Sequence, residues 1–207
     1  MEHLIEKVED LKNSKFRKIV DKRLNEFKEL GRKGNEEWFS ELCFCLLTAN
    51  TSAELGIRIQ KEFEYKGFTK YKNEKDLANK LKKAKYRFYN RRANFINLAN
   101  RYKNLKNILL KQKDMREWLV ENIKGIGYKE ASHLLRNVGF FDYAILDKHI
   151  LRILAEEKLI DAIPNSLNRK RYLEFEKVLH KLCKRIKMTQ GELDLYLWYL
   201  KTGKVLK

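Results

Sequence analysis

The sequence predicts an all-α protein, and three observations support this fold class. Apolar residues recur three and four positions apart in segment after segment, which is the period of an amphipathic helix. The chain of 207 residues contains one proline and nine glycines, so few positions interrupt a helix. A chain of this length can bury one sizeable core without forming independent domains.

The first part of the chain is expected to form two amphipathic helices and then an apolar one. Residues 38–47 are apolar on almost every side, which is typical of a helix enclosed by others. Residues 48–52 are polar and supply a break and a cap for a helix at 53–60. The two amphipathic stripes consist of Leu4, Ile5, Val8 and Leu11, and of Phe16, Ile19, Val20, Leu24 and Phe27.

Helical periodicity continues through the second part of the chain. One expected helix begins at about Tyr128 and directs four apolar side chains inward. These four are Ala131, Leu134, Leu135 and Val138. The other expected helices span residues 77–84, 86–101, 115–123, 150–155, 172–186 and 193–200.

The charge of the chain is strongly positive. The 46 Lys and Arg residues exceed the 28 Asp and Glu residues and give a formal net charge of +18. Such a field concentrates polyanions and makes their binding dependent on salt, so nucleic acid is the leading partner. Lysine- and glutamate-rich surfaces are also found in proteins from hot environments, and charge alone does not separate the two explanations.

The cysteines and the first residues bear on the compartment. Three cysteines cannot form a four-thiolate cluster and lack the pattern of a disulfide framework. Cys43 and Cys45 lie in the apolar helix, where small buried thiols are expected rather than a metal site. The first ten residues alternate charges with leucines, which supports neither a signal peptide nor a membrane span. We therefore expect a cytoplasmic monomer with no metal, no cofactor and no membrane association.

The segment NIKGIGYKEASHLLRNVGFFDYAILDKH, residues 122–149, carries the candidate chemistry. Gly125 and Gly127 permit a tight turn before a helix, where amides and the helix dipole can bind a phosphate oxygen. Lys129 follows as a possible nucleophile, and Asp147 as a carboxylate that could stabilise positive charge on a sugar. A Gly-x-Gly pair alone is most often only a turn. Lys129 could equally be an exposed lysine and Asp147 a helix cap, although capping is compatible with chemistry.

This segment resembles the helix-hairpin-helix of the base-excision DNA glycosylase superfamily. Family members that are also lyases carry a lysine where Lys129 stands, and residues 146–149, Leu-Asp-Lys-His, resemble their Val-Asp-x-His strip. Lys124 stands where a proline is often found, and residues 139–144 contain no proline. Both departures make the hairpin less rigid than in those relatives.

The resemblance implies one glycosylase unit over residues 1–207, with two packed helical subdomains and a DNA-binding cleft between them. The first subdomain would cover residues 35–135 and include the hairpin at 123–130. The second would combine residues 1–34 with 136–207. The implied partner is double-stranded DNA that contains an oxidised guanine.

The resemblance also implies the reaction. A neutral Lys129 amine would attack the sugar C1′, displace the damaged base and form a Schiff base, after which β-elimination would break the strand. Asp147 would stabilise the charge on the sugar ring and orient or deprotonate the amine. His149 is similar to the histidine that lies near the DNA backbone in the superfamily, although a surface histidine is an equal alternative.

Features that the chain lacks indicate which branch of the superfamily it resembles, and the resemblance implies the type of base. No four-cysteine run follows Asp147, unlike the iron–sulfur enzymes, and adenine and alkyl-base glycosylases lack the Lys129 amine. No N-terminal β-domain is expected, so the chain resembles the second, archaeal and bacterial, type of 8-oxoguanine DNA glycosylase/AP lyase. Its tail, residues 198–207, ends in Lys207 as in that type, and this residue would reach the extruded base.

Three further residues are candidates for contacting the opened duplex. Trp198 could stack on the extruded base and Asp194 could meet its Watson–Crick edge, although both lie among leucines at helical spacing that is typical of a core. Asn50, in the polar segment after the apolar helix, could fill the space opposite the orphaned base, or serve as a loop residue or cap.

Two alternatives remain open at this stage. A glycosylase for oxidised pyrimidines would use the same Lys129 and Asp147 pair. A non-catalytic helix-hairpin-helix protein would use the hairpin only to clamp the DNA backbone.

Overall fold

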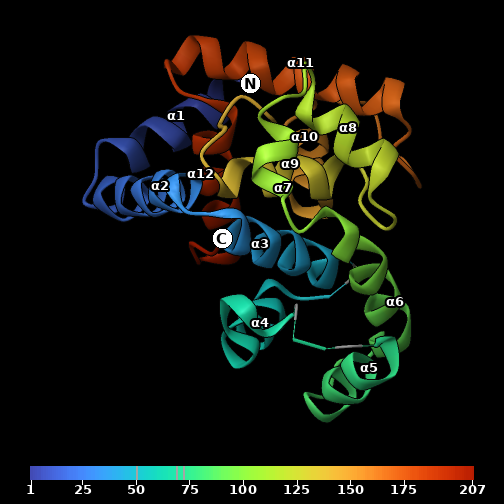
Figure 1. Ribbon diagram of the computed structural model, residues 1–207. Coiled ribbons are helices and arrows are strands. Elements are labelled where there is room, and N and C mark those ends of the chain that lie inside the picture. Colours follow the sequence, from blue (N-terminus) through green and yellow to red (C-terminus); the bar gives the residue numbers. More distant parts are fainter. Residues whose placement is uncertain (50, 69, 72) are drawn as a thin grey trace. The chain divides into compact units, whose positions relative to one another are not determined.

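The computed structural model describes residues 1–49, 51–68, 70–71 and 73–207, and for residues 64–66 it describes the backbone alone. In these ranges the chain forms twelve α-helices, one 3-10 helix and no strand, which confirms the all-α prediction (Figure 1). The α-helices are α1 (Glu2–Lys12), α2 (Phe16–Arg32), α3 (Asn35–Thr48), α4 (Ala53–Gly67), α5 (Glu74–Lys83), α6 (Tyr89–Ala99), α7 (Leu105–Leu109), α8 (Met115–Asn122), α9 (Tyr128–Asn137), α10 (Lys148–Glu156), α11 (Arg169–Ile186) and α12 (Gln190–Thr202); the 3-10 helix is Asn100–Tyr102.

The chain divides into two compact units. Unit 1 comprises Met1–Glu29 and Leu135–Lys207, and unit 2 comprises Leu30–Leu134. In unit 1, α12 contacts α1, α10 and α11. In unit 2, α3 contacts α4, α6 and α7, and α5 packs on α6 (Figure 1). No helix in the described ranges is long and apolar enough to cross a membrane.

Helix α3 forms the centre of the core of unit 2. Every residue from Trp38 to Thr48 is buried, as the apolar sequence predicts. Such burial on all faces requires neighbours on several sides, and α4, α6 and α7 supply them. Burial also raises the pKa of the Cys43 thiol well above its ordinary value, so this cysteine stays neutral and acts as a small apolar residue.

Helix α2 buries a narrower stripe than the sequence suggests. Phe16, Val20 and Phe27 are buried, whereas Ile19 is 53% exposed. On a helical projection Ile19 lies at the edge of this stripe, away from the line through the three buried side chains. The apolar stripe predicted from the sequence therefore includes one residue, Ile19, that is not buried.

The helix expected over residues 86–101 begins later, at Tyr89. Lys85 adopts a left-handed backbone conformation with φ of 57°, which ends the preceding helical turn. Tyr86 is buried, and its hydroxyl donates to the Leu47 carbonyl of α3 at 2.7 Å. The chain therefore turns at these two residues before α6 can start.

The turn between α8 and α9 depends on a glycine. Gly125 has φ of +92°, and a Cβ at this position would overlap the ring of Phe95 from α6. The Ile126 amide donates to the Ile123 carbonyl at 3.1 Å, which closes the turn, and Ile126 is buried. The Gly127 carbonyl then accepts from Ala131 at 2.9 Å, so Gly127 is the N-cap of α9.

Gly125→Ala should destabilise the protein because it combines left-handed strain with the overlap on Phe95. The two costs together are about 2–4 kcal/mol. Gly203→Ala is the matched control, since Gly203 has φ of +70° and no atom within 4 Å of the added Cβ. It should cost only the strain, about 1–2 kcal/mol. Urea unfolding of both variants measures the difference, and equal losses would show that the Phe95 contact contributes nothing.

Candidate functional site

Two polar contacts fix α8 against α9. The Tyr128 hydroxyl, at the start of α9, donates to the Glu117 carboxylate of α8 at 2.6 Å. Deeper between the helices, a buried Arg116 donates to Ser132 at 3.4 Å. The two helices and their turn thus form a helix-hairpin-helix, whose inward positions Ala131, Leu134, Leu135 and Val138 are buried as expected.

The start of α9 has the features of an anion-binding end. The Ile126 amide donates to Ile123 and the Gly127 amide donates to Glu130, so the amides that could face an anion are those of the first turn of α9, beside the positive end of the helix dipole. Lys124 is exposed at the same turn and adds a positive charge. This geometry can bind a phosphate oxygen of a DNA backbone, which is the role predicted for Gly125 and Gly127.

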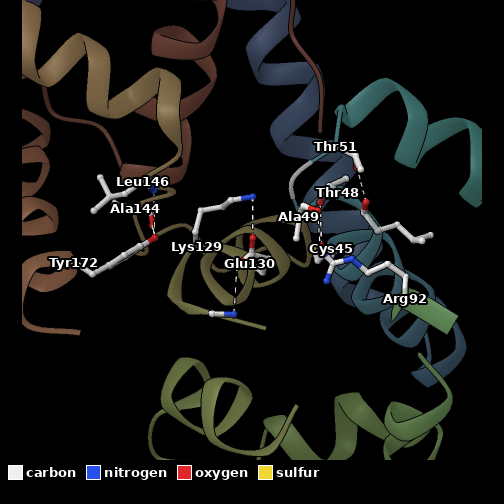
Figure 2. Close-up of polar contacts among 12 residues, drawn as sticks. Cys45, Thr48, Ala49, Thr51, Arg92, Lys129, Glu130, Ala144, Leu146 and Tyr172 are labelled. Carbon is white, nitrogen blue, oxygen red and sulfur yellow. Dashed lines mark hydrogen bonds and ion pairs between the residues drawn. The ribbon is translucent and has the colours of Figure 1, made fainter. Parts of the chain in front are cut away.

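Lys129 lies in the first turn of α9 with its side chain 27% exposed. Its Nζ is 3.1 Å from Oε1 of Glu130, which is 15% exposed (Figure 2). The Gly127 amide donates to the other oxygen of Glu130 at 3.3 Å. The predicted nucleophile is therefore held by an ion pair next to the hairpin rather than extended into solvent.

Asp147 is the N-cap of α10, a position that the sequence allowed as a second role. Its Oδ1 accepts from the amides of His149 at 2.8 Å and Ile150 at 2.9 Å. Both capping bonds use the same oxygen, so Oδ2 lies outside the cap. A carboxylate held in this way can cap the helix through Oδ1 while Oδ2 interacts with another group.

The segment before Asp147 is fixed by two side chains of α11. The Tyr172 hydroxyl donates to the Ala144 carbonyl at 2.7 Å and accepts from the Leu146 amide at 3.2 Å (Figure 2). Glu176 accepts from the Ala144 amide at 3.0 Å. These contacts satisfy the backbone groups of an irregular segment that has no strand partner in the described structure. They also fix the chain immediately before Asp147, the N-cap of α10.

Two other predicted residues meet within unit 1. The rings of His149 and Trp198 are in edge-to-face contact, with centroids 4.9 Å apart. Nδ1 of His149 and Nε1 of Trp198 are both buried and have no hydrogen-bond partner among the described residues. Buried ring nitrogens usually have such a partner, so the two rings bring two unsatisfied polar atoms into a buried aromatic contact. A contact of His149 with the DNA backbone, and stacking by Trp198, remain predictions.

Asp194 and Lys207 lie in the last part of the chain. Asp194 is 9% exposed, and its carboxylate lies 3.3 Å from Nη1 of Arg136. This ion pair explains why a carboxylate is tolerated on the buried side of α12. Lys207 is half-buried. Their predicted contacts with an extruded base remain predictions.

Side chains satisfy the carbonyl groups at the C-terminal end of α3. Arg92 donates to Ala49 at 2.7 Å, Thr51 donates to Leu47 at 2.6 Å, and Thr48 donates to Cys45 at 3.1 Å (Figure 2). The last carbonyls of the helix, which have no helical partners, are therefore satisfied by side chains. Asn50, predicted to contact the orphaned base, lies outside the described residues.

Sequence reasoning missed Glu130, Tyr172 and Glu176. A signal for Glu130 was present, because a glutamate three positions after an N-cap is the pattern of a capping box. No local pattern could identify Tyr172 or Glu176, whose partners lie more than twenty residues away in the sequence.

Comparison with known proteins agrees with this geometry. A family model described as 8-oxoguanine DNA glycosylase matches residues 20–188. An 8-oxoguanine DNA glycosylase/AP lyase of Methanocaldococcus jannaschii is 56% identical over 207 residues, which covers 99% of each chain.

Two solved structures are also similar. The M. jannaschii 8-oxoguanine glycosylase/lyase in complex with 15mer DNA containing 8-oxoguanine has a TM-score of 0.96 and 54% identity, and covers 99% of this chain and 100% of that one. The 8-oxoguanine DNA glycosylase of Thermotoga maritima has a TM-score of 0.92 and 44% identity, with 100% and 99% covered. On the evidence of the family match and of these relatives, the chain belongs to the 8-oxoguanine DNA glycosylase family.

Proposed function

We propose that this protein removes 8-oxoguanine from double-stranded DNA and then cleaves the strand at the resulting abasic site. The observation that carries the proposal is a lysine in the first turn after a glycine hairpin, in a chain that matches 8-oxoguanine DNA glycosylase/AP lyases along its whole length. The hairpin would grip the backbone and the lysine would perform the chemistry.

Lys129 is the proposed nucleophile. In its neutral form the amine attacks C1′ of the damaged nucleotide, and the bond from C1′ to the base breaks. The base leaves with the electron pair and takes up a proton, and opening of the sugar ring gives a Schiff base on Lys129. Loss of the C2′ proton then expels the 3′ phosphate by β-elimination.

Asp147 is proposed to stabilise the positive charge that develops on the sugar during base loss. A carboxylate whose position is fixed by two amides needs little reorganisation when that charge appears, which is the condition for strong electrostatic stabilisation. His149 is proposed to lie near the DNA backbone. Trp198, Asp194 and Lys207 are proposed to contact the extruded base, and Asn50 to contact the orphaned one.

Guanine and 8-oxoguanine differ at N7 and C8, because the lesion carries a hydrogen on N7 and an oxygen on C8. An acceptor directed at N7 binds the lesion and repels the lone pair of normal guanine, and an unpaired polar contact of this kind gives strong discrimination. A backbone carbonyl or the end of the chain could supply this acceptor.

Borohydride trapping of Lys129→Gln tests the nucleophile. The wild-type protein should form a covalent adduct with a duplex containing 8-oxoguanine, whereas Lys129→Gln should form none because an amide cannot make a Schiff base. Lys124→Gln is the control, since it removes the same charge from the same turn and should still be trapped. Undiminished trapping of Lys129→Gln would exclude Lys129.

The same trapping assay separates the two alternative functions. Preferential trapping on duplexes that contain an oxidised pyrimidine would identify a pyrimidine glycosylase. If the protein cleaves no abasic DNA, a non-catalytic DNA-binding protein is favoured.

Asp147→Asn separates the two roles of this residue. Asparagine caps a helix about as well as aspartate, so the unfolding free energy should change by less than about 0.5 kcal/mol. The single-turnover rate of base excision should fall about 100-fold or more because the charge is lost. Asp114→Asn is the control, because Asp114 caps α8 in the same way by accepting from Glu117 at 2.9 Å. An unchanged excision rate in Asp147→Asn would remove Asp147 from the chemistry.

DNA affinity should fall steeply with ionic strength, because binding by a chain of +18 charge releases counterions from the phosphates. The dissociation constant for a short duplex should rise at least about tenfold between about 50 and 200 mM salt. Fluorescence anisotropy measures this directly. A flat dependence would contradict binding through the DNA backbone.

A further inference from the structure

Glu130 joins the hairpin to the lysine that follows it. One carboxylate oxygen accepts from the Gly127 amide at 3.3 Å, and the other lies 3.1 Å from Nζ of Lys129 (Figure 2). A Cβ on residue 127 would lie 3.3 Å from the same Glu130 oxygen, so glycine leaves the carboxylate the space to approach. The three residues therefore form a closed set of contacts within one helical turn.

An ion pair between neighbouring helix residues is not a default of helix geometry. Side chains at positions i and i+1 point in different directions and do not face each other. Here the amide of Gly127 draws the Glu130 carboxylate back over the first turn, and this brings the second oxygen within reach of Lys129. The cap and the ion pair thus use the two oxygens of one carboxylate.

The start of α3 shows the same cap without a lysine. The Gly34 amide donates to Oε2 of Glu37 at 3.0 Å, and a Cβ on Gly34 would again lie 3.3 Å from that oxygen. The residue between them that corresponds to Lys129 is Glu36. Capping alone therefore needs only one oxygen of the glutamate, and the contact of the second oxygen with an amine is particular to α9.

We propose that Glu130 is the positioning residue for Lys129: it fixes the amine relative to the hairpin amides, so that the element that grips the DNA backbone also aims the nucleophile. This inference rests on the proposed function, because it needs Lys129 to attack the sugar. A lysine side chain has many rotamers, and restricting them before the reaction removes an entropic cost from the chemical step. Glu130 need not touch the DNA to have this effect.

The test compares Glu130→Gln with Glu37→Gln. Each glutamine keeps an oxygen that can accept from the glycine amide, so both helix caps are retained, whereas the negative charge is lost. Trapping with borohydride is followed under single-turnover conditions at saturating protein, at a temperature below both unfolding transitions, so that stability differences do not enter the rate. The dissociation constant for the 8-oxoguanine duplex is measured in parallel.

Glu130→Gln should slow Schiff base formation about tenfold or more, because the aim of the amine is lost. The dissociation constant should not rise, because removing a negative charge beside the hairpin does not weaken binding of a phosphate backbone. Glu37→Gln should leave both quantities at the wild-type level. A wild-type rate for Glu130→Gln, or equal slowing by Glu37→Gln, would overturn the inference while the proposed function stands. Absence of any adduct with the wild-type protein would overturn both.

Discussion

The contact of Gly125 with the Phe95 ring is the constraint on which the hairpin depends. The backbone of this residue is left-handed and lies so close to the ring that no side chain fits between them. Because the turn is pressed onto α6 in this way, the direction in which α9 leaves it is fixed. The bond from Tyr128 to Glu117 then holds the first turn of α9 against α8. The candidate functional groups of this region, the hairpin amides and the Lys129 amine, therefore depend on one packed glycine for their positions.

The candidate chemistry makes use of helix capping. Asp147 begins α10 and Glu130 completes the cap of α9, and both are acidic groups placed by backbone amides. A cap uses one oxygen of a carboxylate, and the second oxygen remains available for another partner. In α9 this second oxygen faces an amine, whereas the equivalent glutamate of α3, Glu37, has a carboxylate as its neighbour in the chain. In the proposed mechanism, the residue beside the capping glutamate gives this common structural motif a role in the reaction.

Most of the fold follows from periodicity, and the exceptions have physical causes. The apolar run of α3 and the inward face of α9 could be predicted because many regularly spaced residues contribute to each pattern. The late start of α6 could not, since it depends on a bond from Tyr86 to Leu47 far away in the sequence. Helix α7, with five residues, is too short to show a period. In the site, Asp147 could be recognised as a helix start from its neighbours, whereas the support from Tyr172 is purely tertiary.

The hydroxyl of Tyr172 has a consequence for the dynamics of unit 1. It provides hydrogen bonds for both the Ala144 carbonyl and the Leu146 amide, which in a sheet would come from a neighbouring strand. Tyr172 belongs to the first turn of α11, so this segment keeps its order only while that helix remains wound. The opening of one therefore exposes the other, and the Leu146 amide should exchange its hydrogen together with the amides near the start of α11 as a single cooperative element.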